Sequence, residues 1–257
     1  MCGRMLVKVS GKVYFHQFSS QEDGWEYVVA PDQYQSLPEE DEPREVAPTD
    51  RVLIHRVVGG RIVPDWGFWT LVPPWIEAPC ALGTTSSGRE RLVPPARTHF
   101  NSRADTLTGS KGWKALLEHN RCVLFANAFF EWSDAEMLAG RAKQVGRFSL
   151  ASGEPMMLAG ICSPVRVEDR EVLTVSVVTT SPNAMLQSLP HHRMPAILRG
   201  KDRSRWMDPK STQPQLALHP TPEAQMESRV EPANRYRELA GSRISLDDLV
   251  LDLGMDR

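Results

Sequence analysis

Three apolar runs of strand length constrain the fold of this chain more than any other feature of its sequence. They cover residues 121–130, 156–162 and 172–179, and the last is rich in β-branched side chains. Runs of this length and composition are typical of buried strands, because β-branched residues fit a pleated surface. We therefore expect a β-rich chain.

Weaker patterns predict further elements around these runs. The expected additional strands are residues 6–18, 51–58 and 61–63, the last two joined by a hairpin turn at Gly59-Gly60. The expected helices are residues 112–120, 183–189 and 202–207. The expected loops and polar connections are residues 36–50, 77–98 and 211–234.

Length and charge limit the classes of protein to which the chain can belong. Its 257 residues fit one domain over 1–257, and 41% hydrophobic with 24% charged residues is ordinary for a globular protein. Because 30 Lys and Arg are balanced by 32 Asp and Glu, the chain cannot coat nucleic acid by bulk charge. Any nucleic-acid binding must be local.

The cysteines and the N-terminal residues indicate the compartment. The four cysteines form no CxxC pair, so we expect neither a zinc site nor a disulfide framework, and no metal or organic cofactor. The first residues do not have the pattern of a signal peptide, and no 18-residue apolar run occurs. We expect a cytoplasmic protein with no membrane partner and no obligate protein partner.

Cys2 combines two nucleophiles on adjacent carbons once Met1 is removed. Its α-amine and thiol have reference pKa values of about 7.7–8.0 and about 8.5, so both are partly nucleophilic at neutral pH. An aldehyde can form an imine with the amine, after which the sulfur can close a five-membered thiazolidine ring. The alternative is that Cys2 is an ordinary terminal cysteine.

A carboxylate follows the first apolar run. Glu131 lies between Phe130 and Trp132 in the segment FANAFFEW. Partial burial there would raise its pKa and suit general acid/base chemistry near neutral pH. The alternative is a solvated residue at the end of a strand.

Polar residues in two further segments are candidates for a site. In LPHHRMPAIL, His191 or His192 could move protons, although adjacent histidines point to different sides, and Arg193 could hold a phosphate. In FNSRADT, Asn101 could orient a carbonyl or an amine, with Arg103 on the same side if the segment is a strand.

Four tryptophans offer flat surfaces on which bases could stack, worth about 1–3 kcal/mol per base, with core packing as the alternative. They are Trp66, Trp69, Trp75 and Trp132.

Taken together and in order, six motifs resemble the SRAP (SOS response-associated peptidase) family over residues 1–207. They are MCGR at the N-terminus, VAPT at 46–49, a WG…PPW segment at 66–75, FNSRADT, RCVLFANAFFEW and HHRMPAIL. The resemblance implies a single α+β domain that is β-rich, with mixed and antiparallel sheets forming a barrel-like core and a few peripheral helices. Residues 212–257 match the family poorly.

The resemblance also implies a function, namely crosslinking to abasic sites in single-stranded DNA, a lyase-type chemistry without a cofactor. Such a protein would be associated with the nucleoid when it is bound to DNA. Cys2 would be the nucleophile, Asn101 would position its amine and the sugar, Glu131 would assist opening of the deoxyribose ring, and His191 would be the fourth catalytic residue. The implied DNA-binding residues are Arg4, Trp75, Arg103, Trp132, Thr180 and Arg193.

The chain departs from the family pattern at a few positions. Glu45 replaces an asparagine, Ala128 replaces a turn glycine, and Phe130 replaces a tyrosine. Two rival functions also remain open. One is a thiol peptidase, possibly limited to its own first residue, in which Cys2 and His191 form a nucleophile–base pair, and the other is a non-catalytic single-strand binder.

Overall fold

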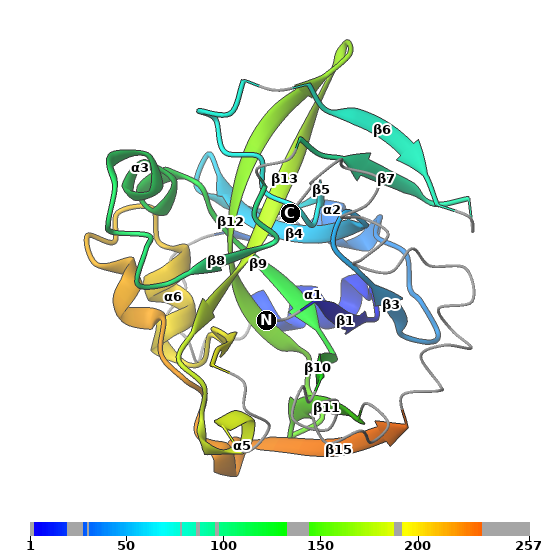
Figure 1. The fold of residues 1–257 in the computed structure, drawn as a ribbon, viewed down its shortest axis with the longest axis vertical. Helices are drawn as coiled ribbons and strands as arrows, with labels where there is room; N and C mark the ends of the chain where they lie inside the picture. The colour runs from blue at the N-terminus through cyan, green and yellow to red at the C-terminus, as the bar shows by residue number, and fades with distance from the viewer. Residues whose placement is uncertain are drawn as a thin grey trace, which may run out of the picture.

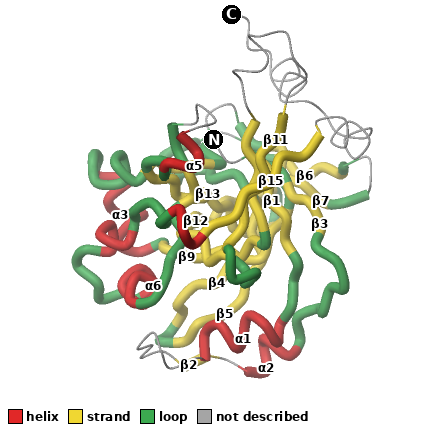
Figure 2. Tube along the Cα trace, turned by 90° about the horizontal axis from the view of Figure 1, so that it is seen from below, coloured by secondary structure: helices red, strands yellow, loops and turns green. Residues whose placement is uncertain are grey.

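A computed structural model describes residues 3–19, 28–29, 31–77, 79–85, 88–95, 98–132, 144–187 and 192–232. Strands fill the centre of the molecule and short helices lie at its periphery (Figures 1 and 2), which confirms the β-rich fold with few helices. The strands are β1 (Arg4–Val7), β2 (Val28–Val29), β3 (Arg44–Val46), β4 (Arg51–Val58), β5 (Arg61–Phe68), β6 (Ala81–Thr84), β7 (Glu90–Val93), β8 (Asn101–Arg103), β9 (Arg121–Ala126), β10 (Ala128–Trp132), β11 (Gln144–Leu150), β12 (Met156–Val167), β13 (Arg170–Thr180), β14 (Met194–Pro195) and β15 (Met226–Pro232). The helices are α1 (Gly11–Ser19), α2 (Pro31–Gln35), α3 (Lys111–His119), α5 (Ala184–Gln187) and α6 (Lys201–Met207), with 3-10 turns η2 (Pro214–Ala217) and η3 (Glu223–Gln225).

The larger sheet closes into a barrel. Its strand order is β14-β13-β12-β9-β4-β5-β2, and β13 also pairs in parallel with β5, opposite Gly67 and Phe68. This extra pairing closes a barrel of β13, β12, β9, β4 and β5, which confirms the expected barrel-like core. The expected hairpin turn is present, and Gly59 and Gly60 have φ of 56° and 74°, a conformation that glycine adopts without a steric penalty.

The second sheet carries the first strand of the chain. Its order is β15-β11-β10-β1-β3, and all of its pairings are antiparallel. The apolar run at 121–130 divides at Asn127, so that β9 belongs to the barrel and β10 to the second sheet. Asn127 fixes this bend, because its backbone N–H donates to Leu6 O at 2.7 Å and its side-chain Oδ1 accepts from Lys8 N–H at 2.8 Å.

Four expected segments differ from the structure. Residues 36–50, expected as loop, contain the short strand β3, which pairs with β1. Residues 6–18 are not one strand, because β1 ends at Val7 and α1 follows, burying Tyr14 and Phe18 at helical spacing. Residues 77–98 contain the hairpin β6–β7 rather than only loop, and residues 211–234 contain β15. Both missed segments pair through the backbone while many of their side chains stay exposed, so their sequences lack an apolar pattern.

The helices near residues 112 and 202 are confirmed as α3 and α6, and the third expected helix is α5, with residues 188–189 outside the described part. Arg121 ties two of the helices to the barrel. Its guanidinium donates to Trp206 O and Asp208 O, both at 2.6 Å, and to Glu118 O at 3.0 Å. These carbonyls lie at the C-terminal ends of α6 and α3, where backbone acceptors lack helical partners.

Candidate nucleic-acid interface

The start of the chain lies beside the strand that carries Glu131. Strand β1 pairs antiparallel with β10, and Arg4 is opposite Phe130, the residue that precedes Glu131. Cys2 and His191, two of the four expected catalytic residues, lie outside the described residues. The structure therefore places the segment that follows Cys2 but not Cys2 itself.

Glu131 is buried rather than solvated. Only 1% of its surface is exposed, and it lies on the second sheet between β1 and β11, opposite Gly146. Its neighbour Phe130 is 2% exposed and packs in a small apolar cluster with Val145, which Trp132 covers. The solvated-residue interpretation is thus wrong, because Glu131 is a buried carboxylate.

Two of the family departures are accommodated by the fold. Phe130 packs in the apolar cluster with Val145, where a side chain without a phenol hydroxyl is accommodated. Ala128 lies opposite Leu6 in regular strand pairing and does not have a positive φ, so a glycine is not required at that position.

The third departure, Glu45, changes the charge around Arg4. Arg4 Nη1 contacts Glu45 Oε1 at 2.8 Å, and the two side chains are only 18% and 11% exposed. Arg89 donates to the backbone carbonyl of the same residue at 3.4 Å. An expected phosphate-binding arginine is therefore held by a carboxylate that the family pattern does not contain.

Three strands bring a second group of expected residues together. Strand β8 pairs with β13 with Arg103 opposite Thr179, and β14 pairs with β13 with Met194 opposite Thr180. Arg193 precedes β14, and its Nε donates to Thr179 Oγ1 at 3.0 Å. Asn101 begins β8 on the same face as Arg103, as the strand interpretation predicted.

Asp105 joins the two arginines of this group, and sequence reasoning missed it. It accepts from Arg103 Nε at 3.1 Å and Nη2 at 2.6 Å, and it lies 3.4 Å from Arg193 Nη2. The hydrogen bond from Arg103 is the main cause that lowers the pKa of Asp105 to about 2, with Arg193 adding a smaller effect. The sequence held a signal for the first of these contacts, since Asp105 lies two residues after Arg103, which is itself a predicted phosphate-binding residue. It held none for the contact with Arg193.

Thr180 is placed in this region, but its hydroxyl is already used. The residue is 5% exposed, and Oγ1 donates to Leu218 O at 3.2 Å. Its side chain therefore stabilises the strand end, and any contact of Thr180 with DNA would involve other atoms.

The tryptophans divide between core and surface. Trp69 is fully buried and donates to Phe100 O at 2.8 Å, so it belongs to the core. Trp75 is 44% exposed and packs edge-on against Trp113, with ring centroids 5.5 Å apart. A Cβ at Gly112 would lie 2.6 Å from the Trp75 ring, so glycine there lets Trp75 lie against α3.

Trp113 extends this aromatic surface toward β8. Its ring lies 5.3 Å from that of His99, which is two residues before Asn101. Sequence reasoning placed Trp113 only on a helix, because nothing in the local pattern shows that Trp75 would pack on it.

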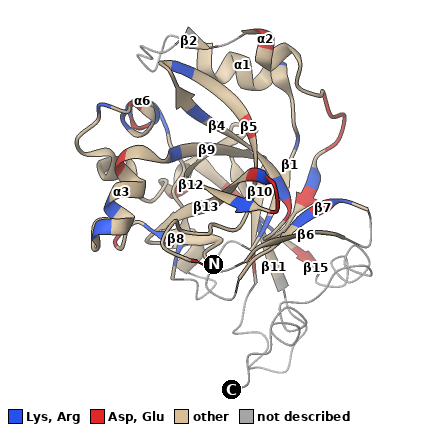
Figure 3. Ribbon diagram, turned by 90° about the horizontal axis from the view of Figure 1, so that it is seen from above, with Lys and Arg blue, Asp and Glu red and all other residues tan. Residues whose placement is uncertain are grey.

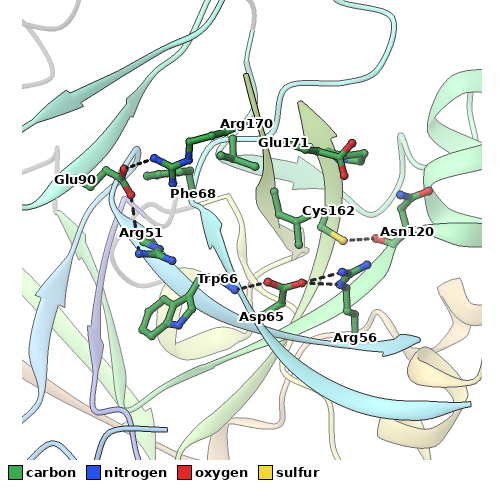
Figure 4. Close-up of a pocket in the computed structure, with 13 residues that line it drawn as sticks. Arg51, Arg56, Asp65, Trp66, Phe68, Glu90, Asn120, Cys162, Arg170 and Glu171 are labelled. Carbon is green, nitrogen blue, oxygen red and sulfur yellow. Dashed lines mark hydrogen bonds and ion pairs between the residues drawn. The ribbon is translucent and has the colours of Figure 1, made fainter. Parts of the chain in front are cut away.

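A cavity lies at the opposite end of β13 (Figure 4), and Trp66 is the one described candidate residue that lines it. Its volume is about 430 Å³, and its charged lining residues are Arg51, Arg56, Asp65, Glu90, Arg170 and Glu171. Glu90 contacts Arg51 at 3.9 Å and Arg170 at 3.3 Å, and Asp65 contacts Arg56 at 2.7 Å. Its three arginines are matched by three carboxylates, so the cavity offers no excess charge to an anion.

Charges of both signs are interspersed elsewhere too, as Figure 3 shows around β7. Among the described residues, no group of three or more His, Cys, Asp or Glu side chains is arranged to hold a metal ion. In the same part of the chain, none of the helices has the length and apolar character needed to span a membrane.

Solved structures support the fold. A crystal structure of a protein from Bacteroides thetaiotaomicron superposes with a TM-score of 0.66 at 20% identity, covering 92% of this chain and 94% of that one. A phage-related protein from Bordetella bronchiseptica gives a TM-score of 0.61 at 18% identity, covering 90% of this chain and 94% of its own. At these identities the likeness shows a shared fold alone.

Relatives with names are also found by sequence. The abasic site processing protein YedK of Escherichia coli is 27% identical over 210 residues, which cover 80% of this chain and 79% of YedK. The abasic site processing protein YoqW of Bacillus subtilis is 29% identical over 147 residues, 57% of this chain, so the match spans only 58% of the length of YoqW. The family model described as SOS response associated peptidase (SRAP) matches residues 1–233. The chain therefore belongs to the SRAP family.

Proposed function

We propose that this protein binds single-stranded DNA at abasic sites and forms a covalent link to them through Cys2, after removal of Met1. The pairing of β1 with β10 supports the proposal, because β1 begins two residues after Cys2 and lies beside the strand that carries the buried Glu131. The relatives YedK and YoqW are named abasic site processing proteins, which supports the same substrate.

The reaction proceeds in three balanced steps. Ring opening of the abasic sugar converts its hemiacetal to an aldehyde, with Glu131 moving the proton between the ring oxygen and the C1 hydroxyl. The α-amine of Cys2 adds to the aldehyde carbon, and loss of water gives an imine. The thiol of Cys2 then adds across the imine, its proton passes to nitrogen, and a thiazolidine closes.

The other catalytic residues act around these steps. Asn101 holds the amine and the sugar through its amide, and His191 moves protons on the imine. No metal or organic cofactor takes part. The described cysteines are poor rivals for Cys2, because Cys122 and Cys162 are buried and burial raises the pKa of the Cys80 thiol.

DNA contacts come from the groups around β8 and β13. Arg103 and Arg193 hold backbone phosphates, Arg4 does so beside Glu45, and the exposed face of Trp75 stacks a base. Trp132 lies on β10 directly after Glu131, at the junction between the sugar and the stacked strand.

An oligonucleotide with one abasic site tests the proposal. The processed protein should give a heat-stable shifted band, whereas Cys2→Ser should give at most an imine that borohydride traps. Cys80→Ser is the matched control and should crosslink normally. A Cys2→Ser protein with as much heat-stable adduct as the wild type would exclude the thiazolidine.

Two further measurements separate the rivals. An N-terminal extension should abolish the crosslink although every side chain is intact, because the α-amine is then an amide. A thiol peptidase would instead hydrolyse peptides in the absence of DNA, and a non-catalytic binder would retain the oligonucleotide only under native conditions.

A further inference from the structure

Two arginines that flank the end of β13 share one carboxylate. Arg103 ends β8 and Arg193 precedes β14, and both strands pair with β13 near Thr179. The carboxylate of Asp105 contacts both guanidinium groups, at 2.6 Å and 3.4 Å. The two cations therefore lie on either side of a single anion.

The contacts leave the same part of each guanidinium available. Asp105 takes Nε and Nη2 of Arg103, while Thr179 and Asp105 take Nε and Nη2 of Arg193. Within the described residues, neither Nη1 atom has a hydrogen-bond partner. Because each Nη1 carries two protons in the guanidinium plane, both arginines keep donors that are not used within the described residues.

The two arginines depend on Asp105 to different degrees. Arg193 is 16% exposed and is also held by Thr179, whereas Arg103 is 58% exposed and has only Asp105 as a side-chain partner among the described residues. A free arginine side chain has about 2 kcal/mol of rotamer entropy to lose on binding. Asp105 removes much of that freedom beforehand and offsets the repulsion between the two cations.

We propose that Asp105 is a positioning residue that joins Arg103 and Arg193 into one clamp for a single backbone phosphate. The inference rests on the proposed binding of single-stranded DNA. The three charges sum to +1, which one phosphate neutralises, whereas two independent arginines would neutralise two. The clamp lies next to Thr180, because Met194, which follows Arg193, is paired with Thr180 across β13 and β14.

The salt dependence of binding distinguishes the clamp from independent arginines. Arg4 adds little to the slope of log K against log salt, because its charge is balanced by Glu45. Independent contacts by Arg103 and Arg193 would give a slope of about −1.4, at about −0.7 per contact, whereas the clamp counts as one contact, so the wild type should show about −0.7 with an intact oligothymidylate.

Asp105→Asn tests the positioning role. At 0.15 M salt it should weaken affinity for the intact strand about tenfold, because an ordered charge-assisted contact is lost. Its slope should become steeper by about 0.7, since the two cations then act separately. Asp105→Glu should restore most of the affinity, and Asp65→Asn, which removes one charge from another Arg–carboxylate pair, should match the wild type.

Failure of the clamp can be distinguished from failure of the proposed crosslinking function. Asp105→Asn should still crosslink at the wild-type rate when the abasic oligonucleotide is saturating, so only the half-saturating concentration rises. Absence of any crosslink in the wild type would refute the proposed chemistry but leave the affinity series intact. Affinity that is unchanged or tighter in Asp105→Asn, or a wild type without measurable single-strand binding, would overturn the clamp.

Discussion

The two ends of β13 are built from the same kinds of residue but are organised differently. At the end near Thr179, two arginines share one carboxylate, and a positive charge remains. At the end near Leu173, three arginines face three carboxylates around the cavity of about 430 Å³ (Figure 4). The comparison teaches that volume alone does not make an anion site, because an anion needs donors whose charge is not already compensated, and such donors remain only at the Thr179 end of the two.

The largest expected difference is in catalysis, between the buried carboxylate on β10 and a carboxylate beside the cavity. Glu131→Gln should slow crosslinking by a factor of about 10²–10⁴, because the amide cannot move the proton of the sugar hydroxyl. Glu171→Gln, the same change beside the cavity, should leave the rate unaltered. The rate is read from single-turnover time courses with saturating abasic oligonucleotide.

Equal rates for Glu131→Gln and the wild type would remove the catalytic difference between the two regions. Glu131 would then be a buried structural carboxylate beside Trp132, and the acid/base role would have to lie elsewhere.

Stacking should give the next largest difference. Trp75→Ala should weaken binding of an intact single strand by about 1–3 kcal/mol, because one base loses its aromatic surface. Trp66→Ala should have no such effect, since Arg51 already lies over that ring at 5.2 Å. Fluorescence anisotropy measures both affinities, and thermal melting checks that each variant is folded. A larger loss in Trp66→Ala would place the bound strand near the cavity.

Removal of one arginine from each end of β13 should change the affinity for single-stranded DNA by amounts that differ about tenfold. Arg193→Ala should bind the intact strand about tenfold more weakly, because a charge-assisted phosphate contact is lost. Arg170→Ala removes the same charge, but from an arginine that is paired with Glu90, and it should bind as the wild type does. Equal weakening in both variants would mean that net charge, rather than the clamp, determines affinity.

The smallest expected difference between the two ends of β13 is in the free energy of unfolding. Asp105→Asn and Asp65→Asn should each lower the free energy of unfolding by at most about 1 kcal/mol, because more than a third of each carboxylate side chain is exposed to solvent. The folded pKa of Asp105, about 2, lies below its unfolded value of about 3.9. Its stabilisation is therefore complete above pH 4 and is lost as the pH falls toward 2.

Urea unfolding of wild type and Asp105→Asn at pH 7 and pH 2.5 measures this change. The difference between the two proteins should shrink at the lower pH. A difference that grows on acidification would show that the protonated form of Asp105 is the stabilising one.

Local patterns in the sequence predicted those parts of the fold in which side-chain chemistry repeats along the chain. The apolar runs gave β9, β12 and β13, the paired glycines gave the β4–β5 turn, and the amphipathic spacing gave α3. The same patterns failed for α1, which was taken as strand, and for β6, β7 and β15. These strands are held by backbone pairing at sheet edges and in a hairpin, which leaves little trace in side-chain type.

Part of the candidate site could likewise be predicted from the sequence alone. The order of the motifs indicated the SRAP family, and the position of Cys2 behind Met1 indicated aminothiol chemistry. These conclusions depend on which residues are present and on their local order, and neither depends on how distant segments pack.

Only the tertiary structure decided which distant residues meet. The pairing of β1 with β10 sets Arg4 beside the strand of Glu131, and the pairing of β8 and β14 with β13 lets Asp105 hold both Arg103 and Arg193. Strand partners and their register follow from burying both sheets at once and from closing the barrel. Because those conditions involve the whole chain, no local pattern could show that Asp105 would stand between two arginines.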